Sequence, residues 1–271
     1  MRSRIKTVVA DINLTAAQAY VEALNEKHSG SAASGASTQV ITSAVQVDIT
    51  RWDSQVKAFE ASLAFLGGQI DYVFAIAGIG ERAWLPKLGD LALQSNGNFV
   101  KPDLSVIDAN LVGTLHTVSL AVQQMQRQEP DAGAFRGRIA VAASVCGFYC
   151  VPSLPVYTAA KHGVIGFVRS YGKLLAGHGI ALNAVCPLIV RTAISREEFY
   201  EDVEARGLVV PMEKVVAAFR ECMSGSTVGG ECLEVGPKTD PFDVRGVAGY
   251  LDLESEESCN LLNVRAMSYH V

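Results

Sequence analysis

The chain has 271 residues, of which 49% are hydrophobic, and it carries 23 Lys and Arg against 28 Asp and Glu. This composition is too apolar for a disordered protein, and the length is sufficient for one α/β domain with a large core. The net charge of -5 provides no basic surface, which argues against nucleic acid or an anionic membrane as a partner.

The N-terminal residues contain no hydrophobic signal core, because the apolar run at 7–10 ends at Asp11. We therefore expect a cytoplasmic protein. The six cysteines show no Cys-x-x-Cys spacing and the five histidines are scattered. This pattern indicates no metal site, and the thiols are expected to be reduced and buried.

Strand-like and helix-like runs alternate along the chain, which is typical of a doubly wound parallel sheet. Apolar and β-branched runs predict strands at 7–11, 40–48, 70–77, 138–143, 180–186 and 232–235. Helical periodicity predicts helices at 14–25, 53–66, 107–128, 156–176 and 212–223. We expect one domain over 1–235, followed by an irregular C-terminal tail over 236–271.

Two side chains with acid–base chemistry lie four residues apart on the predicted helix at 156–176. Tyr157 and Lys161 therefore share one face of that helix, with the ammonium near the phenol. A nearby cation stabilises a phenolate, so Lys161 is expected to lower the Tyr157 pKa from its usual value of about 10. Such a phenol can act as a general acid or base near neutral pH.

Ser144 and Asn110 add two polar groups to this pair. Ser144 follows the strand at 138–143, at the carboxyl end where open α/β sheets bind ligands, and Asn110 lies on the helix before that strand. Asn110 in DANLVGT, Ser144 in AASVCG, and Tyr157 with Lys161 in YTAAK resemble, in order and spacing, the tetrad of short-chain dehydrogenases/reductases. The resemblance extends over nearly the whole chain, and the tail is similar to filamentous-fungal members related to 15-hydroxyprostaglandin dehydrogenase.

The resemblance implies a catalytic role for each of the four residues. Tyr157 would exchange the proton of an alcohol or ketone, while Lys161 would lower its pKa and hold the nicotinamide ribose. Ser144 would hydrogen-bond the substrate oxygen, and Asn110 would order a water that relays the proton from Lys161. Hydride would move to or from a nicotinamide cofactor.

The same resemblance implies further cofactor contacts. Asp11 would accept hydrogen bonds from the adenosine ribose and repel a 2′-phosphate, which favours NAD(H) over NADP(H). Asp11 could equally be a turn former at the end of a strand. Asp48 and Ile49 resemble a pair that contacts adenine. Ala77 and Gly78 resemble the end of the family's Asn-Asn-Ala-Gly strand, and Val190 and Thr192 resemble contacts of the nicotinamide amide.

The glycine-rich turn of a dinucleotide-binding fold is absent from the sequence. It is expected about 20 residues before the ribose-binding acid, which here falls ahead of residue 1. The family's strand order, 3-2-1-4-5-6-7, then leaves the strands at 7–11 and 70–77 without the neighbour between them. Three explanations are open: a gene model that lacks its first exon, a strand pair that closes up, or a protein that has dropped cofactor binding.

We therefore expect an α/β, Rossmann-like, doubly wound parallel sheet that lacks the usual first strand. The expected function is an NAD(H)-dependent oxidoreductase that interconverts a secondary alcohol and a ketone, on a small hydrophobic or specialised metabolite. The alternative is a cofactor-independent or inactive protein of this fold that acts as a binding partner, isomerase or dehydratase. The expected partner is a small-molecule substrate, and family analogy implies a homo-oligomer.

Overall fold

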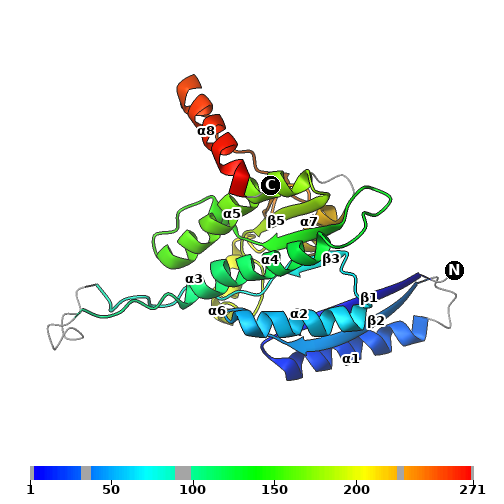
Figure 1. Ribbon diagram of the computed structural model, residues 1–271. Helices are drawn as coiled ribbons and strands as arrows, with labels where there is room; N and C mark the ends of the chain where they lie inside the picture. The colour runs from blue at the N-terminus through cyan, green and yellow to red at the C-terminus, as the bar shows by residue number, and fades with distance from the viewer. Residues whose placement is uncertain (1–2, 32–37, 89–98, 225–228, 270–271) are drawn as a thin grey trace.

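The computed structural model describes residues 3–31, 38–88, 99–224 and 229–269, and its strands form two separate sheets (Figure 1). The smaller sheet pairs β1 (Ser3–Asp11) with β2 (Thr38–Gln46) in parallel. The larger sheet has the order β3-β4-β5-β6-β7 and is parallel from β3 to β6. Its strands are β3 (Tyr72–Ala75), β4 (Gly137–Ala142), β5 (Ile180–Pro187), β6 (Cys232–Val235) and the antiparallel β7 (Asp243–Val244).

Helices cover both sheets. In the smaller sheet, α1 (Leu14–Ser31) and α2 (Trp52–Leu66) lie on opposite faces of β1 and β2 (Figure 1). In the larger sheet, β3 to β5 pack against α4 (Thr114–Met125) and α5 (Pro155–Ala176), while β4 to β6 pack against α7 (Met212–Met223). The remaining helices are α3 (Ser105–Ile107), η3 (Asp108–Gly113), η4 (Val145–Gly147), α6 (Glu197–Ala205), α8 (Leu253–Ala266) and η5 (Met267–Tyr269). The expected Rossmann-like α/β class is thereby confirmed.

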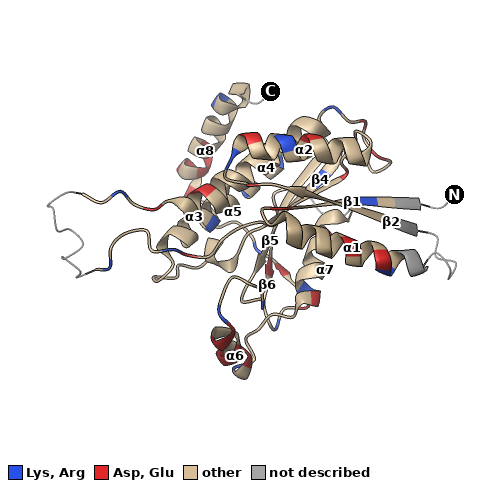
Figure 2. Ribbon diagram, turned by 90° about the horizontal axis from the view of Figure 1, so that it is seen from below, with Lys and Arg blue, Asp and Glu red and all other residues tan. Residues whose placement is uncertain are grey.

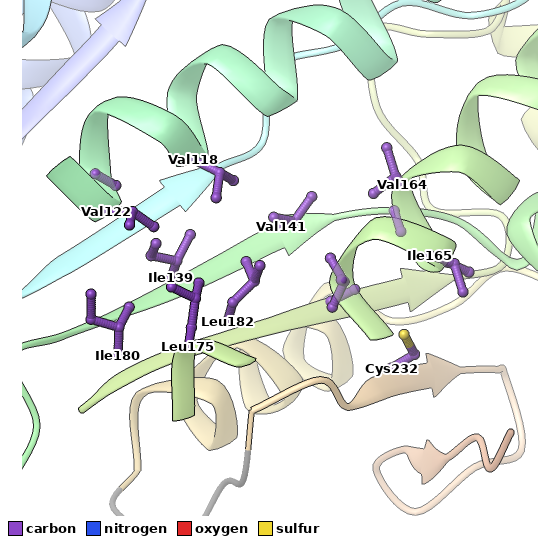
Figure 3. Packing of buried hydrophobic residues seen from close by; sticks show 14 of the residues in the cluster. Val118, Val122, Ile139, Val141, Val164, Ile165, Leu175, Ile180, Leu182 and Cys232 are labelled. Atoms are coloured by element: carbon purple, nitrogen blue, oxygen red, sulfur yellow. The ribbon is translucent and has the colours of Figure 1, made fainter. Parts of the chain in front are cut away.

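The main core lies between the larger sheet and the α4–α5 layer (Figure 3). Val118 and Val122 of α4 meet Ile139 and Val141 of β4, and all four side chains are at most 4% exposed. Ala140, between those two β4 residues, belongs instead to a second cluster against α7. Successive strand residues point to opposite faces, so the larger sheet is buried on both sides, as parallel sheets are.

The helical run Ser105–Met125 has the length and hydropathy of a membrane span. In this structure it comprises α3, η3 and α4, and the side chains of Val118, Ala121 and Met125 on it are fully buried in the core. Its packing is that of a core helix of the sheet.

Several predicted boundaries are wrong, and β1 begins at Ser3 rather than at residue 7. Helix α1 continues to Ser31 rather than ending near Asn25, because the Asn25 side chain binds the main chain of Thr42 in β2 instead of terminating the helix. The tail over 236–271 is not irregular, since it contains β7, α8 and η5. The Asp252 carboxylate accepts a hydrogen bond from Ser255 N and caps α8, a local signal that the sequence prediction missed.

The sheet is interrupted where the sequence predicts a missing neighbour. Within the described ranges, strand β1 pairs with β2 alone and β3 pairs with β4 alone, so each has one unpaired edge. This prediction is confirmed, and the alternative in which the two strands close up is wrong because β1 and β3 are not hydrogen-bonded to each other. Apolar side chains on both strands are exposed: Ile5 by 53% and Phe74 by 40%.

Helix α2 holds the two sheets in one body. Lys6 of β1 donates to the carbonyl of Phe65 at the end of α2, at 2.9 Å. Gln55, at the other end of α2, donates through Nε2 to the Gly113 carbonyl of η3, also at 2.9 Å. Because η3 continues into α4, which packs on the larger sheet, α2 acts as the bridge between the two sheets.

The packing of α5 generates a stability prediction for two of its glycines. A Cβ at Gly172 would lie 2.4 Å from Gly230 N and 2.6 Å from Leu182 O, both of them main-chain atoms. A Cβ at Gly166 would meet nothing within 4 Å. We expect Gly172→Ala to lower the free energy of unfolding by about 1–3 kcal/mol or more. Gly166→Ala should raise it by up to about 1 kcal/mol, because alanine favours the helix. Denaturant unfolding of both variants tests this contrast, and equal effects would contradict the close packing of α5 on β5.

Candidate active site

Ser144 stands just past the carboxyl end of β4, where the chain leaves the sheet. Its backbone is extended, with φ -172°, and its Oγ accepts a hydrogen bond from Cys146 N at 3.2 Å, which begins η4. The side chain is buried, and its hydroxyl lies close enough to the phenol of Tyr157 on α5 to lower the pKa of that phenol. The structure therefore brings Ser144 and Tyr157 together, as the sequence predicts.

Lys161 lies one turn after Tyr157 on α5 and shares its face. Its Nζ is 5.5 Å from the centre of the Tyr157 ring and donates to the carbonyl of Ala142, at the end of β4, at 2.9 Å. The side chain is only 6% exposed, and this burial lowers the Lys161 pKa to about 8. The ammonium is thus held between α5 and the end of β4, the strand that precedes Ser144.

The expectation that Lys161 lowers the Tyr157 pKa is wrong for this structure. Burial raises the pKa of the Tyr157 phenol, and the nearby Ser144 hydroxyl lowers it by less. Lys161 does not offset the burial: its ammonium donates to the Ala142 carbonyl and lies 5.5 Å from the centre of the Tyr157 ring.

Thiols surround this lysine. Cys146 and Cys186 are both buried near the Lys161 ammonium. All six cysteines are free, but Cys150 and Cys259 are exposed, contrary to the expectation that every thiol is buried. Among the residues that the structure describes, no group of three or more His, Cys, Asp or Glu side chains could hold a metal ion.

Asn110 lies in η3, a π-helical segment that the periodicity of the sequence did not reveal. Its Oδ1 accepts from Ile79 N and its Nδ2 donates to Ile79 O, both at 2.8 Å. The carboxamide therefore clamps the loop that follows β3. The clamp needs a glycine beside it, because a Cβ at Gly78 would lie 2.7 Å from Asn110 Oδ1. Ala77 and Gly78 are both exposed at this strand end.

Asp48 and Ile49 form the turn after β2. The Asp48 carboxylate accepts from Thr50 N and Thr50 Oγ1 at 2.9 and 2.7 Å, and these hydrogen bonds lower its pKa, with the hydroxyl having the largest effect. The Ile49 carbonyl accepts from Gln55 at 2.6 Å and would lie 2.9 Å from a Cβ at Gly113. This turn therefore contacts η3, the segment that carries Asn110.

Asp11 lies at the end of β1, in the smaller sheet. Its Oδ1 accepts from Asn13 N at 2.8 Å, and its carboxylate is exposed. That contact is typical of the turn-forming alternative, and it leaves the second carboxylate oxygen available to a ligand. In the described residues, the interrupted sheet separates Asp11 from Ser144 and Tyr157.

Val190 and Thr192 follow β5. Val190 packs against the second core cluster, and Thr192 Oγ1 lies 3.3 Å from the hydroxyl of Tyr200 on α6. Ile194, two residues further on, would contact a Cβ at Gly80 at 3.4 Å. The loop after β5 therefore meets the loop after β3. The expected cofactor contacts Val190 and Thr192 thus belong to a loop that lies beside the one that follows Ala77 and Gly78.

Arg191 links α6 to the loop after β5. It pairs with Glu197 and, at 2.6 Å, with Glu204. Figure 2 shows α6 as an acidic helix that projects away from the larger sheet. His116 and His162 stand apart from these contacts: His116 packs edge-on against Trp52 at 5.2 Å, and His162 is exposed, with Nδ1 3.0 Å from Thr158 O.

Glu81 is a polar residue of the site that the sequence prediction missed. Its carboxylate accepts from Val156 N at 3.3 Å and from Tyr157 N at 2.6 Å, at the first turn of α5. Glu81 precedes Val156 by 75 positions and Tyr157 by 76, so no local pattern pointed to the contact.

Comparison with known proteins agrees with this geometry. A model of the short chain dehydrogenase family matches residues 1–202. The chain is 32% identical over 190 residues to the short-chain dehydrogenase/reductase prx7 of Penicillium rubens, covering 69% of this chain and 65% of that protein. It is 28% identical over 222 residues to the short-chain dehydrogenase srdC of Neurospora crassa, covering 78% and 76%.

A third similar protein is the short-chain dehydrogenase/reductase ATR7 of Stachybotrys chlorohalonatus. It is 33% identical over 151 residues, covering 56% of this chain and 43% of ATR7. The chain thus spans less than two thirds of prx7 and less than half of ATR7. The expected resemblance to fungal members is confirmed, while the link to 15-hydroxyprostaglandin dehydrogenase stays a prediction. With its α/β architecture, its Ser144–Tyr157–Lys161 cluster and the matched residues 1–202, this chain belongs to the short-chain dehydrogenase family.

Proposed function

We propose that this chain forms the catalytic part of an NAD(H)-dependent oxidoreductase that interconverts a secondary alcohol and a ketone. The observation that carries the proposal is the close approach of the Ser144 hydroxyl to the Tyr157 phenol, with Lys161 on the same helix face and Asn110 clamping the adjacent loop. These groups meet at the carboxyl ends of parallel strands, where open α/β sheets bind ligands.

The chain's own residues can move one proton and orient one oxygen. In ketone reduction, Ser144 donates a hydrogen bond to the carbonyl oxygen of the substrate, and Tyr157 delivers its phenolic proton to that oxygen. In alcohol oxidation, the phenolate accepts the proton back. A raised phenol pKa keeps Tyr157 protonated at neutral pH, which suits the proton donor of a reduction.

The residues around this cluster fit the nicotinamide end of the cofactor. Gly78 is exposed at the end of β3, and the Lys161 ammonium, with one donor on Ala142 O, has others for a ribose hydroxyl. When bound, the nicotinamide would supply or accept the hydride. For the pyrophosphate, the sequence contains no glycine-rich turn after a strand.

The preference for NAD(H) over NADP(H) rests on Asp11. Its exposed carboxylate stands at the end of β1, where it would accept ribose hydroxyls and repel a 2′-phosphate. The same proposal includes a small hydrophobic or specialised metabolite as the substrate. It also includes a homo-oligomeric state and a cytoplasmic location. The substrate class draws support from the matching fungal short-chain dehydrogenases.

The interrupted sheet favours a second candidate. A protein of this fold without cofactor binding could act as a binding partner, or as an isomerase or dehydratase that uses Tyr157 alone. The unpaired edges of β1 and β3 lie where a dinucleotide-binding strand and turn would stand, so the two candidates differ in a single measurable property.

That property is saturable NADH binding, measured by calorimetry or by nicotinamide fluorescence. We expect the 271-residue chain to bind NADH weakly or not at all, and a version extended upstream by a strand and a glycine-rich turn to bind it. Binding should favour NADH over NADPH, and Asp11→Asn should reduce that preference. If both versions fail to bind, the oxidoreductase proposal is wrong and the second candidate stands.

The proposed proton donor has its own test. In an active form of the protein, Tyr157→Phe should lower kcat by roughly 10²–10⁴-fold with an intact fold, because it removes only the hydroxyl. Tyr171→Phe, on the same helix but outside the site, is the matched control and should leave kcat unchanged. Normal turnover by Tyr157→Phe would refute the role.

The buried lysine predicts a pH-dependent stability. Its pKa of about 8 in the folded protein lies below the ordinary 10.5 of an unfolded lysine, so burial of the ammonium costs stability at all pH values below 8. This cost is relieved as pH rises from 8 to 10.5, because the unfolded chain then binds more protons.

We therefore expect the free energy of unfolding of the native chain to rise by up to about 3 kcal/mol over this interval, relative to Lys161→Met. Urea unfolding between pH 7 and 10.5 measures the difference. Lys173→Met removes an exposed lysine from the same helix and controls for the loss of one charge. A constant difference between the native chain and Lys161→Met would contradict the burial of the ammonium.

A further inference from the structure

The first turn of α5 has no cap of its own. Leu154 occupies the capping position and its side chain offers no acceptor, while Pro155 begins the helix without an N–H group. The first turn also contains no acidic residue that could interact with the positive end of the helix dipole. The main-chain N–H groups of Val156 and Tyr157 therefore need an acceptor from elsewhere.

Glu81 provides that acceptor from the loop after β3. One carboxylate oxygen accepts from Val156 N at 3.3 Å and the other from Tyr157 N at 2.6 Å. A carboxylate that accepts main-chain N–H groups at a helix N-terminus makes charge-assisted hydrogen bonds, which are shorter and stronger than neutral ones. The shorter of the two contacts is made to the residue that carries the phenol.

The loop that carries Glu81 is itself fixed by the site. Asn110 holds Ile79 at both its N–H and its carbonyl, two residues before Glu81. The chain from Ile79 to Glu81 therefore links η3 to the first turn of α5. Ser144 is anchored separately, at the end of β4, by the sheet.

We propose that Glu81 is a positioning residue: its carboxylate sets the first turn of α5 and thereby the place of the Tyr157 phenol relative to Ser144. The inference rests on the proposed function, in which Tyr157 is the proton donor. Because the bond is made to the N–H of Tyr157 itself, loss of the carboxylate displaces the residue directly. Displacements of about 1 Å can reduce the rate of an aligned reaction by about 10²-fold.

The test reads the position of Tyr157 without any turnover, in the 271-residue chain. The chain is labelled with 3-fluorotyrosine, and the resonance that disappears in Tyr157→Phe is assigned to position 157. Amide hydrogen exchange of Val156 and Tyr157 is measured in parallel. The variants are Glu81→Gln, which keeps one acceptor oxygen, and Glu81→Ala, which keeps none. Asp103→Asn is the matched control, because Asp103 accepts from Ser105 N at 2.8 Å at the start of a different helix.

We expect Glu81→Ala to speed the exchange of the two amides by roughly tenfold or more and to shift the Tyr157 fluorine resonance, with Glu81→Gln intermediate. Asp103→Asn should change neither readout. If the amides exchange faster but the fluorine resonance does not move, Glu81 is only a structural cap and the proposal is overturned. If Glu81→Ala does not fold, Glu81→Gln decides the same question.

In an active, cofactor-binding form, Glu81→Gln should lower kcat by about tenfold or more with little change in KM, because binding does not require the alignment of the phenol. A change in KM alone would overturn the proposal. If Tyr157→Phe keeps normal turnover, the proposed function fails, and the exchange and fluorine readouts still decide whether Glu81 positions Tyr157.

Discussion

The parallel hydrogen-bonded ladder from β3 to β6 fixes where every candidate side chain of the larger sheet stands. Because these strands run in one direction, Gly78, Ser144 and Val190 all follow carboxyl ends and meet at one edge. The ladder is rigid because both faces are covered, by α4 and α5 on one side and α7 on the other. Tyr157 and Lys161 take their places from α5, which packs on this ladder and shares its core.

The same ladder stops at β3, and this interruption separates the two halves of the expected cofactor site. Asp11, Asp48 and Ile49 belong to the smaller sheet or its loops, whereas Ser144 and Tyr157 belong to the larger one. Helix α2 and the contact between Ile49 and Gly113 keep the halves in one body. In the part of the chain that the structure describes, no strand pairs with the free edges of β1 and β3, whereas folded proteins usually cover such edges.

Burial governs the electrostatics of the site. It lowers the pKa of the Lys161 ammonium and raises that of the Tyr157 phenol, so both groups are shifted toward their neutral forms. The sequence suggested the opposite for Tyr157, because spacing alone shows that two side chains share a helix face and not where their charged atoms point. Lys161 donates to the carbonyl of Ala142, which lies at the end of β4 and not on the helix that carries Lys161.

The sequence by itself determined the α/β class, strands β1 to β6, the helices α1, α2, α4, α5 and α7 that cover them, and the shared face of Tyr157 and Lys161. It also indicated the two strands that lack a neighbour. These features follow from local periodicity, and from the order of motifs along the chain. Only the tertiary structure decided that Asn110 clamps Ile79 from within a π-helix, that Lys161 faces Ala142 and that Glu81 caps the helix of Tyr157. The physical reason is that each of these contacts joins residues 19 or more positions apart, through main-chain atoms that every residue possesses, so that no side-chain pattern marks them in advance.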